Sequence, residues 1–593
     1  MSLSPPKYAG SGPKVKSGIY ETDGDQHGSV EDRVSAVEHF GGKPDRGVAE
    51  QSPVESDINA SDVPASTLPS SSWITPMLTD FYQLTMVYAY WKGGRHNDLS
   101  VFELFFRKNP FQGEFTIFAG LSEVIRFVSD FRFSDSDIAF LKKKFPEETP
   151  QEFFDYLLNL DCSELTIHAM AEGTVVFPRT PLIRVEGPLG ICQLLETTLL
   201  NLTNFPSLIA TNAARMRLAA GEDKILLEFG LRRAQGPDGA MSASRYAYMG
   251  GFDATSNVAA AQCYGIDVKG THAHSFVSAF EGPEQLQDRA LGDCEDFWAL
   301  VTEKRAQLKY PSSNVGELAA FVAFAQAFPH DFNALVDTYD SIKSGIPNFL
   351  AVAVALHELG YRSKGIRLDS GDLAFLSVKA REMFADASKE FGIDLSYLQI
   401  VASNEINESV LASLDEQGHS VDIFGIGTNL VTCQAQPALG MVYKLVEING
   451  KPAIKLSNEY HKVTIPGKKH VFRLIGMEGV ALCDVMIANH EDPPMVGKRL
   501  LCRHPYIDRK RANVTPSYVI ELLRPVFIGP ERRVAPQPSL REMRDHVRDQ
   551  LTLIRNDHKR ALNPTEYKVS VTSDLFSLLH TLWLEKVNVA ELE

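Results

Sequence analysis

Six short apolar runs, each ending in polar, charged or glycine residues, constrain the fold of this chain more than any other feature. Helical segments lie between them, for example residues 374–390 and 408–417. The last four runs begin 33, 33 and 23 residues apart, which is the length of strand–helix units with parallel strands. Such units form either a doubly wound sheet or an α/β barrel, and at least six of them favour the barrel. The runs are Ile225–Arg233, Val268–His274, Phe332–Asp340, Gly365–Asp372, Leu398–Asn404 and Val421–Thr428.

The segments on either side of these runs have a different pattern. Residues 73–206 mix a predicted helix over 81–91 with a predicted strand over 101–107, so we expect an α+β domain there. Residues 207–441 contain the six runs and form the predicted catalytic barrel domain. Residues 442–593 begin with short strands and turns and include an amphipathic helix over 539–553, which predicts a β-rich segment with helices.

Residues 1–72 differ in composition from the segments described above. They hold six Lys/Arg, eleven Asp/Glu and seven prolines, and no tryptophan. A segment of this kind buries too little apolar area to offset the entropy lost on ordering. We therefore predict a disordered tail over residues 1–72.

Composition limits the possible environments and partners. The net charge of −16 argues against non-specific binding to nucleic acid or to an anionic membrane. The seven cysteines are scattered and form no CxxC pair, which favours a reducing compartment. No apolar run approaches the roughly 20 residues that a membrane-spanning helix needs. Together these features predict a cytosolic protein.

The polar residues at the strand ends are the candidate functional groups. Arg232 and Arg233 follow Phe229, and a guanidinium beside an aromatic ring suits an aromatic carboxylic acid. Alone, two adjacent arginines are more often a solvated surface. His272 and His274 would share one face of a strand, and a neutral imidazole can accept a phosphoryl group, although a lone histidine is more often structural.

Carboxylates and glycines complete the set of strand ends. Asp337 and Asp340 end the third run, and Asp369 and Asp372 the fourth, where carboxylates can orient ribose hydroxyls or hold Mg²⁺ through water. An Asp-Ser-Gly-Asp sequence can equally be a simple turn. Gly425-Ile-Gly-Thr428 ends the last run, and glycine N–H groups there can approach a phosphate.

These stretches together resemble the nicotinate phosphoribosyltransferases, in particular their longer eukaryotic and bacterial type. The resemblance extends from about residue 78 to the carboxyl end. The matching stretches are Leu78–Gln83, Phe102–Arg107, Gly230–Gly239, Gly251–Asn257, Gly270–Phe276 and the later strand ends.

The resemblance implies a fold and a reaction. The fold is an irregular, TIM-like α/β barrel of type II phosphoribosyltransferases, packed on a β-rich domain that is split between the two ends of the chain. The implied protein is a homodimer with active sites at the subunit interface. Nicotinate and 5-phosphoribosyl 1-pyrophosphate (PRPP) give nicotinate mononucleotide and pyrophosphate, the first step of NAD synthesis from nicotinic acid. ATP hydrolysis drives the reaction, and Mg²⁺ accompanies ATP and PRPP rather than a dedicated set of metal ligands.

The resemblance also implies roles for single residues around the base. Tyr82 of the partner subunit and Phe229 would stack on the two sides of the pyridine ring. Arg232 would bind the nicotinate carboxylate, and Ser256 and Asn257 would lie near the ring.

The remaining roles concern the phosphates and the ribose. Arg367 and Asp369 would contact phosphates and ribose hydroxyls, and Gly427 and Thr428 would hold the 5′-phosphate. Asp337 would lie close to His274. His274 corresponds to the histidine that ATP phosphorylates in the family, whereas the role of His272 stays open.

Two alternatives compete with this interpretation. A nicotinamide phosphoribosyltransferase would have an acidic group near the ring, and Asp253 lies close enough in sequence to leave this alternative open. The chain could also be a non-catalytic nicotinate-binding protein, because a fold alone does not prove activity. A quinolinate enzyme is disfavoured, since that family is much shorter.

Overall fold

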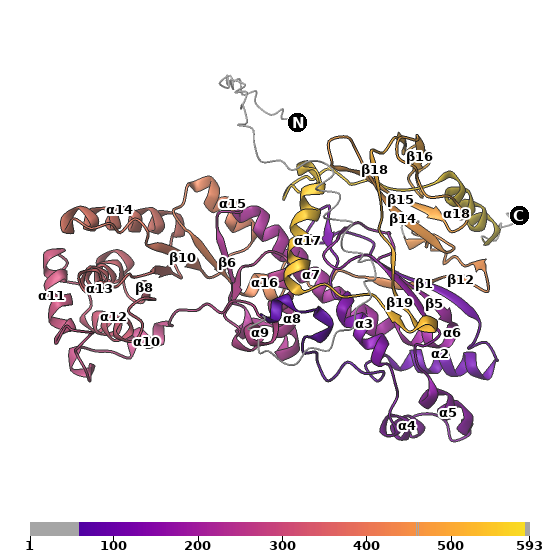
Figure 1. Cartoon of the computed structure of the whole chain (residues 1–593), viewed down its shortest axis with the longest axis horizontal. Helices are drawn as coiled ribbons and strands as arrows, with labels where there is room; N and C mark the ends of the chain where they lie inside the picture. The colour runs from indigo at the N-terminus through magenta and orange to yellow at the C-terminus, as the bar shows by residue number, and fades with distance from the viewer. Residues whose placement is uncertain (1–58, 458, 460–461, 587–593) are drawn as a thin grey trace, which may run out of the picture.

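A computed structural model describes residues 59–457, 459 and 462–586 of the chain. Figure 1 shows an elongated molecule, with the helices α10–α14 at one end and mostly antiparallel sheets at the other. No helix within the described residues is long and apolar enough to cross a membrane.

The segment that precedes the main fold corrects part of the predicted tail. Residues 1–58 lie outside the described residues, but residues 59–72 are folded, with short 3-10 helices η1 (Ala60–Asp62) and η2 (Ala65–Thr67). Ala65 and Leu68 are buried, and Pro64 forms a β-bridge with Ser539. The prediction of disorder is wrong here because two apolar side chains suffice when a folded surface already receives them.

Five of the six predicted strands lie in one parallel sheet. The sixth strand of that sheet, β7, is not one of the predicted runs. The strand order is β7-β6-β11-β10-β9-β8, so the last strand along the chain pairs with the first. All the paired strands run parallel, which places their carboxyl ends along one edge. The strands are β6 (Ile225–Glu228), β7 (Ala254–Thr255), β8 (Asn333–Leu335), β9 (Gly365–Leu368), β10 (Gln399–Ser403) and β11 (Ile423–Ile426).

The run Val268–His274 is not the strand that its pattern predicts. Val268 makes a single parallel bridge to Thr255, and a short helix, α10 (His274–Ser278), begins at His274. The two neighbouring strands of the run, β7 and β8, are themselves only two and three residues long, so little sheet is available to extend it.

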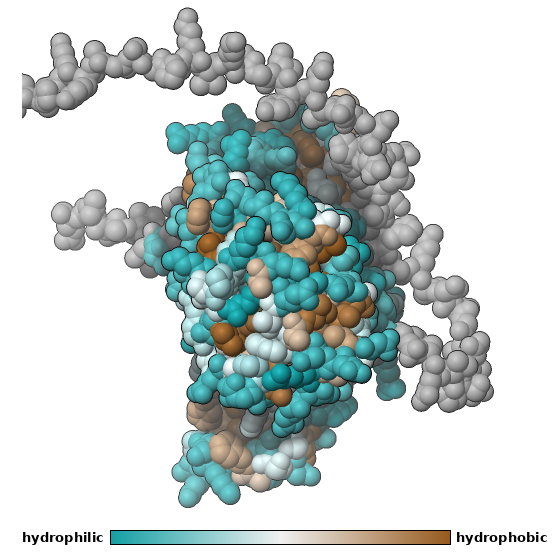
Figure 2. All heavy atoms as spheres, turned by 90° about the vertical axis from the view of Figure 1, so that its left-hand side faces the viewer, coloured by the Kyte–Doolittle hydropathy of each residue, from teal (hydrophilic) through white to brown (hydrophobic). Residues whose placement is uncertain are grey.

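Helices connect these strands and cover the sheet. The two most apolar stretches of the sequence form α12 (Val315–Ala327) and α13 (Ile346–Glu358), and α13 is buried from Ile346 to Leu356. Figure 2 views the end of the molecule where these helices lie, and hydrophilic residues cover most of that surface. The other helices here are α8 (Gly236–Met249), α9 (Val258–Tyr264), α11 (Phe297–Gln307), α14 (Leu373–Phe391), α15 (Glu408–Gln417) and α16 (Thr428–Val431).

A seven-stranded antiparallel sheet combines strands from both ends of the chain. Its order is β13-β12-β1-β5-β3-β19-β20, so the amino-terminal strands lie between carboxyl-terminal ones. The strands are β1 (Leu99–Phe105), β3 (Thr166–Ala169), β5 (Ile183–Pro188), β12 (Val442–Ile448), β13 (Lys451–Pro452), β19 (Arg524–Ile528) and β20 (Arg533–Val534). The strands β2 (Thr116–Ile117) and β4 (Val175–Val176) form a separate two-stranded sheet. The helices of this region are α2 (Phe81–Lys92), α3 (Leu121–Asp130), α4 (Asp135–Lys142), α5 (Gln151–Asn159) and α6 (Leu189–Leu194).

One helix crosses the domain boundary predicted at residues 206 and 207. Helix α7 (Glu196–Ala220) continues through Pro206. Proline has no N–H to donate to the carbonyl of Leu202, four residues earlier. The backbone of Gly120 approaches that carbonyl so closely that a Cβ on Gly120 would lie 1.9 Å from the Leu202 oxygen. The proline therefore lies where neighbouring backbone packs on the helix, and does not end it.

A second, mixed sheet is formed by carboxyl-terminal residues alone, with β15 and β21 parallel and the other neighbouring strands antiparallel. Its order is β17-β16-β21-β15-β14-β18, and α17 (Leu540–Leu553) and α18 (Ser573–Lys586) accompany it. The strands are β14 (Lys469–Ile475), β15 (Ala481–Ala488), β16 (Leu500–Arg503), β17 (Arg511–Val514), β18 (Tyr518–Glu521) and β21 (Val569–Val571).

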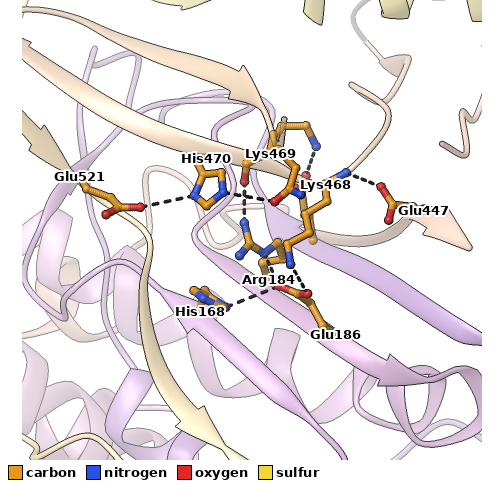
Figure 3. A network of polar contacts seen from close by, with 10 residues as sticks. His168, Arg184, Glu186, Glu447, Lys468, Lys469, His470 and Glu521 are labelled. Atoms are coloured by element: carbon orange, nitrogen blue, oxygen red, sulfur yellow. Dashed lines mark hydrogen bonds and ion pairs between the residues drawn. The ribbon is translucent and has the colours of Figure 1, made fainter. Parts of the chain in front are cut away.

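A polar network joins β14 to the seven-stranded sheet (Figure 3). Lys469 and Glu103 form a fully buried ion pair at 2.6 Å, and burial lowers the pKa of Lys469 and raises that of Glu103. Arg184 on β5 donates to the carbonyl of Lys469 at 2.6 Å and to Glu186 at 2.8 Å. Because buried charges must be paired to be tolerated, these contacts specify how the two sheets dock.

Candidate active site

The aromatic ring of Phe229 lies directly after β6, at the carboxyl edge of the parallel sheet. Its backbone N–H donates to the carbonyl of Ile426 at 2.8 Å, which ties it to the end of β11. The guanidinium carbon of Arg367 lies 5.6 Å from the ring centroid, within the range of a cation–π contact. The edge thus brings together an aromatic ring and a cation from strands far apart in sequence.

Arg367, on β9, is the centre of the polar network at this edge. Its Nη2 donates to Asp369 at 2.7 Å, its Nε to Ser403 at 2.8 Å and its Nη1 to Thr271 at 3.2 Å. Ser403 also donates to Asp369. Ser403 and Thr271 were not predicted as site residues, although both lie within runs that the sequence singles out.

A hydrogen bond links Asp337 and Asp369, which follow the neighbouring strands β8 and β9. The Oδ2 atom of Asp337 accepts from the backbone N–H of Asp369 at 3.0 Å and from the hydroxyl of Ser370 at 2.6 Å. Burial alone would raise the pKa of Asp369, but the hydrogen bond from Ser403 and the charge of Arg367 outweigh it and lower that pKa. Asp369 is therefore an anion at neutral pH. The Oδ1 atom of Asp337 is buried and has no hydrogen-bond partner within the described residues.

His274 is exposed at the start of α10, beside this pair. Its Nδ1 atom lies 3.1 Å from the hydroxyl of Thr338, and its Nε2 atom lies 3.8 Å from Oδ2 of Asp369. Thr338 was not predicted, and its place between the two predicted strand-end aspartates is the only sequence signal for it. The arrangement fixes the imidazole with one nitrogen occupied and the other facing the carboxylate.

His272 has a different environment, so the expectation that both histidines share one face is wrong. It is buried among Phe276, Phe321 and Phe324, and its Nε2 atom accepts from the backbone N–H of Leu335 at 3.3 Å. Burial lowers its pKa to about 4, so the ring is neutral at pH 7. The structural interpretation of a lone histidine therefore applies to His272.

Asp340 and Asp372 act as helix caps. Asp340 accepts from the backbone N–H groups of Ile342 and Lys343, at 3.1 and 2.8 Å. Asp372 accepts from the N–H of Phe375 at 3.0 Å, at the start of α14. A carboxylate at this position satisfies N–H groups that have no partner inside the helix.

Glu228 is a buried carboxylate that the sequence reasoning missed. It accepts hydrogen bonds from the backbone N–H of Gly230, from Ser244 on α8 at 2.8 Å and from Thr255 on β7 at 2.5 Å. Its carboxylate therefore fixes the backbone of Gly230, the residue that follows Phe229. A glutamate as the last residue of an otherwise apolar strand was the available signal.

Ser256 and Asn257 follow β7 next to this carboxylate. The N–H of Ser256 donates to the carbonyl of Glu228 at 2.9 Å. Asn257 is buried, caps α9 through the N–H of Ala260 at 3.2 Å and donates to Ser244 at 3.2 Å. Both residues therefore lie at the same edge as Phe229, with Asn257 engaged in local contacts.

The other predicted residues border this edge or lie away from it. Arg232 is exposed in a 3-10 turn (η3, Leu231–Arg233), and none of the described residues forms an ion pair with it. Gly427 caps α16, whose first residue, Thr428, is exposed. Tyr82 is half exposed on α2, which Figure 1 places apart from β6. One chain therefore does not bring Tyr82 to Phe229.

Asp253 lies at the opposite edge of the sheet. It precedes β7, and its carboxylate binds Arg217 and Arg544, each at 2.6 Å, and the N–H of Leu226 at 2.9 Å. It cannot contact a ring beside Phe229 while it holds the amino ends of the strands. The alternative that required an acidic group near the ring therefore loses its candidate residue.

A parallel sheet with a fixed arginine, carboxylates and a glycine loop at its carboxyl edge is typical of α/β enzymes, whose active sites lie at this edge. Three family profiles match the chain: the nicotinate phosphoribosyltransferase N-terminal domain over residues 77–204, the family itself over 352–484 and its C-terminal domain over 468–579. The chain belongs to the nicotinate phosphoribosyltransferase family.

Individual relatives agree with this assignment. The chain is 53% identical over 537 residues to "Nicotinate phosphoribosyltransferase" of Dictyostelium discoideum, covering 88% of this chain and 91% of that protein. It is 45% identical over 520 residues to the protein of the same name from Homo sapiens, covering 86% of this chain and 96% of that protein. The crystal structure of human nicotinic acid phosphoribosyltransferase superposes with a TM-score of 0.76 at 43% identity, covering 85% of this chain and 99% of that one.

Proposed function

We propose that the chain joins nicotinate to PRPP and releases nicotinate mononucleotide and pyrophosphate, the first step of NAD synthesis from nicotinic acid. Family membership supports this reaction. The observation that carries it is the contact of Arg367 with both the Phe229 ring and the Asp369 carboxylate, because it joins a site for an aromatic base to a site for a phosphorylated sugar. The parallel sheet forms the wall of an irregular α/β barrel in this proposal.

The base is held by side chains at the ends of β6 and β7. Phe229 stacks on the pyridine ring, and the exposed guanidinium of Arg232 binds the carboxylate in two-point contact. Ser256 and Asn257 lie beside the ring. The half-exposed ring of Tyr82 completes the site from the partner subunit of a homodimer.

The sugar and phosphates are held by the neighbouring strand ends. Arg367 neutralises charge on the departing pyrophosphate, Asp369 orients ribose hydroxyls, and Gly427 and Thr428 surround the 5′-phosphate. The carboxylates of Asp337 and Asp369 suit Mg²⁺, which binds one or two carboxylates together with substrate phosphates, and the unpaired Oδ1 of Asp337 fits that role. Mg²⁺ would supply further charge neutralisation at the phosphates.

His274 links the reaction to ATP in this proposal. The imidazole takes the γ-phosphoryl group of ATP as the P–O bond to ADP breaks, and water later hydrolyses the phosphohistidine. The contact of Nδ1 with Thr338 leaves Nε2 as the attacking nitrogen. Phosphorylation adds negative charge beside Asp369 and Arg367, which can shift the site between two binding states.

The test is formation of nicotinate mononucleotide from nicotinate and PRPP with Mg²⁺, with and without ATP, and with nicotinamide as the control base. We expect product from nicotinate only, and more product with ATP. A His274→Ala variant should keep the basal reaction and lose the stimulation by ATP. Full ATP stimulation in that variant would refute the role of His274, and no product from either base in folded protein would refute the function.

A further inference from the structure

The ring of Phe229 fits its place because residue 425 has no side chain. A Cβ atom built on Gly425, in β11, would lie 2.6 Å from both Cδ2 and Cε2 of the Phe229 ring. Non-bonded carbon atoms are normally about 3.5–4.0 Å apart. The backbone dihedrals of Gly425 are not in the left-handed region, so space and not conformation requires glycine at this position.

The backbone of Phe229 is already fixed on both sides. Its N–H is bound to the carbonyl of Ile426, and the N–H of the next residue, Gly230, is bound to the buried carboxylate of Glu228. Side-chain rotation is therefore the main freedom left to the ring. A methyl group at residue 425 would force that rotation, because the ring is the nearest obstacle and Cβ of Ser403 is already 3.4 Å away.

The ring of Phe229 also lies next to the phosphate side of the site. Arg367 contacts the ring and binds Asp369, Ser403 and Thr271. Gly425 and the proposed phosphate-binding residues Gly427 and Thr428 belong to the same four-residue stretch. The end of β11 therefore borders both the ring and the phosphate position.

We propose that Gly425 is a positioning residue for recognition of the pyridine ring: it sets the rotamer of Phe229, and does not itself bind phosphate. The inference rests on the proposed function. It separates two glycines of one motif, assigning Gly425 to the base and Gly427 to the phosphate.

The test is the Gly425→Ala variant, with separate measurement of KM for nicotinate and for PRPP. Loss of well-placed aromatic stacking should raise the nicotinate KM about three- to tenfold. The KM for PRPP should stay within about twofold. Gly239→Ala, whose added Cβ would meet only Gln235 Cβ at an ordinary 3.6 Å, is the matched control and should leave both constants unchanged. A rise confined to PRPP would overturn the proposal.

A double-mutant cycle with Phe229→Ala distinguishes positioning from general damage. Once the ring is absent, Gly425→Ala should add little to the nicotinate KM of Phe229→Ala, because the two changes act through one contact. Additive effects would overturn the proposal. If Gly425→Ala does not fold, the double variant should fold, and failure of both would show that something other than the ring excludes the methyl group.

Wild-type protein separates this inference from the proposed function. Absence of nicotinate mononucleotide with folded wild type would refute the function and the inference with it. Product from wild type, together with an unchanged nicotinate KM in Gly425→Ala, would refute the inference alone.

Discussion

Arg367 connects more of the candidate site than any other single side chain described above. Its three guanidinium nitrogens reach Asp369, Ser403 and Thr271, and its carbon faces the ring of Phe229. Only a planar fork with several donors can make all these contacts at once. The charge of the residue is therefore only part of its role.

The Arg367→Lys variant tests this geometry. Lysine keeps the charge but loses the fork, so we expect kcat/KM for PRPP to fall by about a hundredfold, the scale of losing one preorganised donor. Steady-state kinetics with varied PRPP measures it. Arg95→Lys, at an exposed ion pair with Asp98, is the control and should behave as wild type. An Arg367→Lys enzyme with normal kcat/KM would show that charge alone suffices.

At the scale of single residues, sequence reasoning found those whose own side-chain chemistry and position in the sequence indicate a function. Asp369, Asp337 and His274 lie at the ends of predicted runs, and the family resemblance indicated Arg367. The structure brings all four to one edge. Sequence reasoning missed Glu228 because a strand pattern does not reveal that three donors meet one buried carboxylate. Such convergence depends on the placement of α8 and β7, which no local pattern contains.

At the scale of elements, two aspartates hold the amino ends of the parallel strands in the same way. Asp253 precedes β7 and accepts from the N–H of Leu226 on the neighbouring β6. Asp422 precedes β11 and accepts from the N–H of Ile400 on the neighbouring β10 at 2.7 Å. Each carboxylate also binds an arginine at 2.6 or 2.7 Å. This edge of the sheet therefore contributes stability, whereas the carboxyl edge has the candidate site.

The Asp253→Asn variant tests this division. Removing the charge leaves Arg217 and Arg544 without their shared anion, and we expect the free energy of unfolding to fall by about 1–3 kcal/mol. Urea denaturation measures it. The preference for nicotinate over nicotinamide should not change.

Asp545→Asn, at an exposed contact with Arg548, provides the control and should alter stability by less than about 0.5 kcal/mol. A change in base preference in Asp253→Asn would instead indicate that Asp253 contributes to the binding site of the pyridine ring.

Element prediction succeeded where periodicity and length agreed. Helix α15 begins at Glu408 and ends at Gln417, as its pattern predicts. The prediction failed at residues 268–274, where an apolar run with a polar end makes only a single bridge, and the domain boundary predicted at residues 206 and 207 falls within α7. In both places the neighbours decide the outcome: short strands on either side in the first, and the close approach of Gly120 in the second.

At the scale of the whole molecule, the chain is held together by contacts distant in sequence. The folded segment 59–72 reaches α17 through Pro64 and Asp62, and β12 and β19 flank strands from the amino-terminal half. Hydrophobic patterns predicted the pieces but not these pairings, because register and docking are set by complementary surfaces. The seven-stranded sheet required the resemblance to a family before it could be expected.

Buried neutral histidines make the stability of the whole chain sensitive to acid. Burial lowers the pKa of His272 and of His546 to about 4, from an ordinary value of 6.5. The unfolded chain then binds protons first as the pH falls below 6.5. Each group's contribution is complete above pH 6.5 and is lost progressively toward pH 4, with a slope of up to about 1.4 kcal/mol per pH unit.

The His546→Gln variant tests the assignment, since glutamine keeps a partner for the hydroxyl of Thr174, 3.2 Å from Nε2 in the native protein. We expect the free energy of unfolding to fall between pH 6.5 and 5 in wild type, and less steeply in the variant. Urea denaturation at several pH values measures the slope, and above pH 5 most carboxylates stay ionised. His490→Gln, at an exposed position, should reproduce the wild-type slope. Equal slopes in wild type and His546→Gln would show that other groups cause the acid sensitivity. A histidine whose pKa is the same in the folded and the unfolded chain does not make the free energy of unfolding depend on pH.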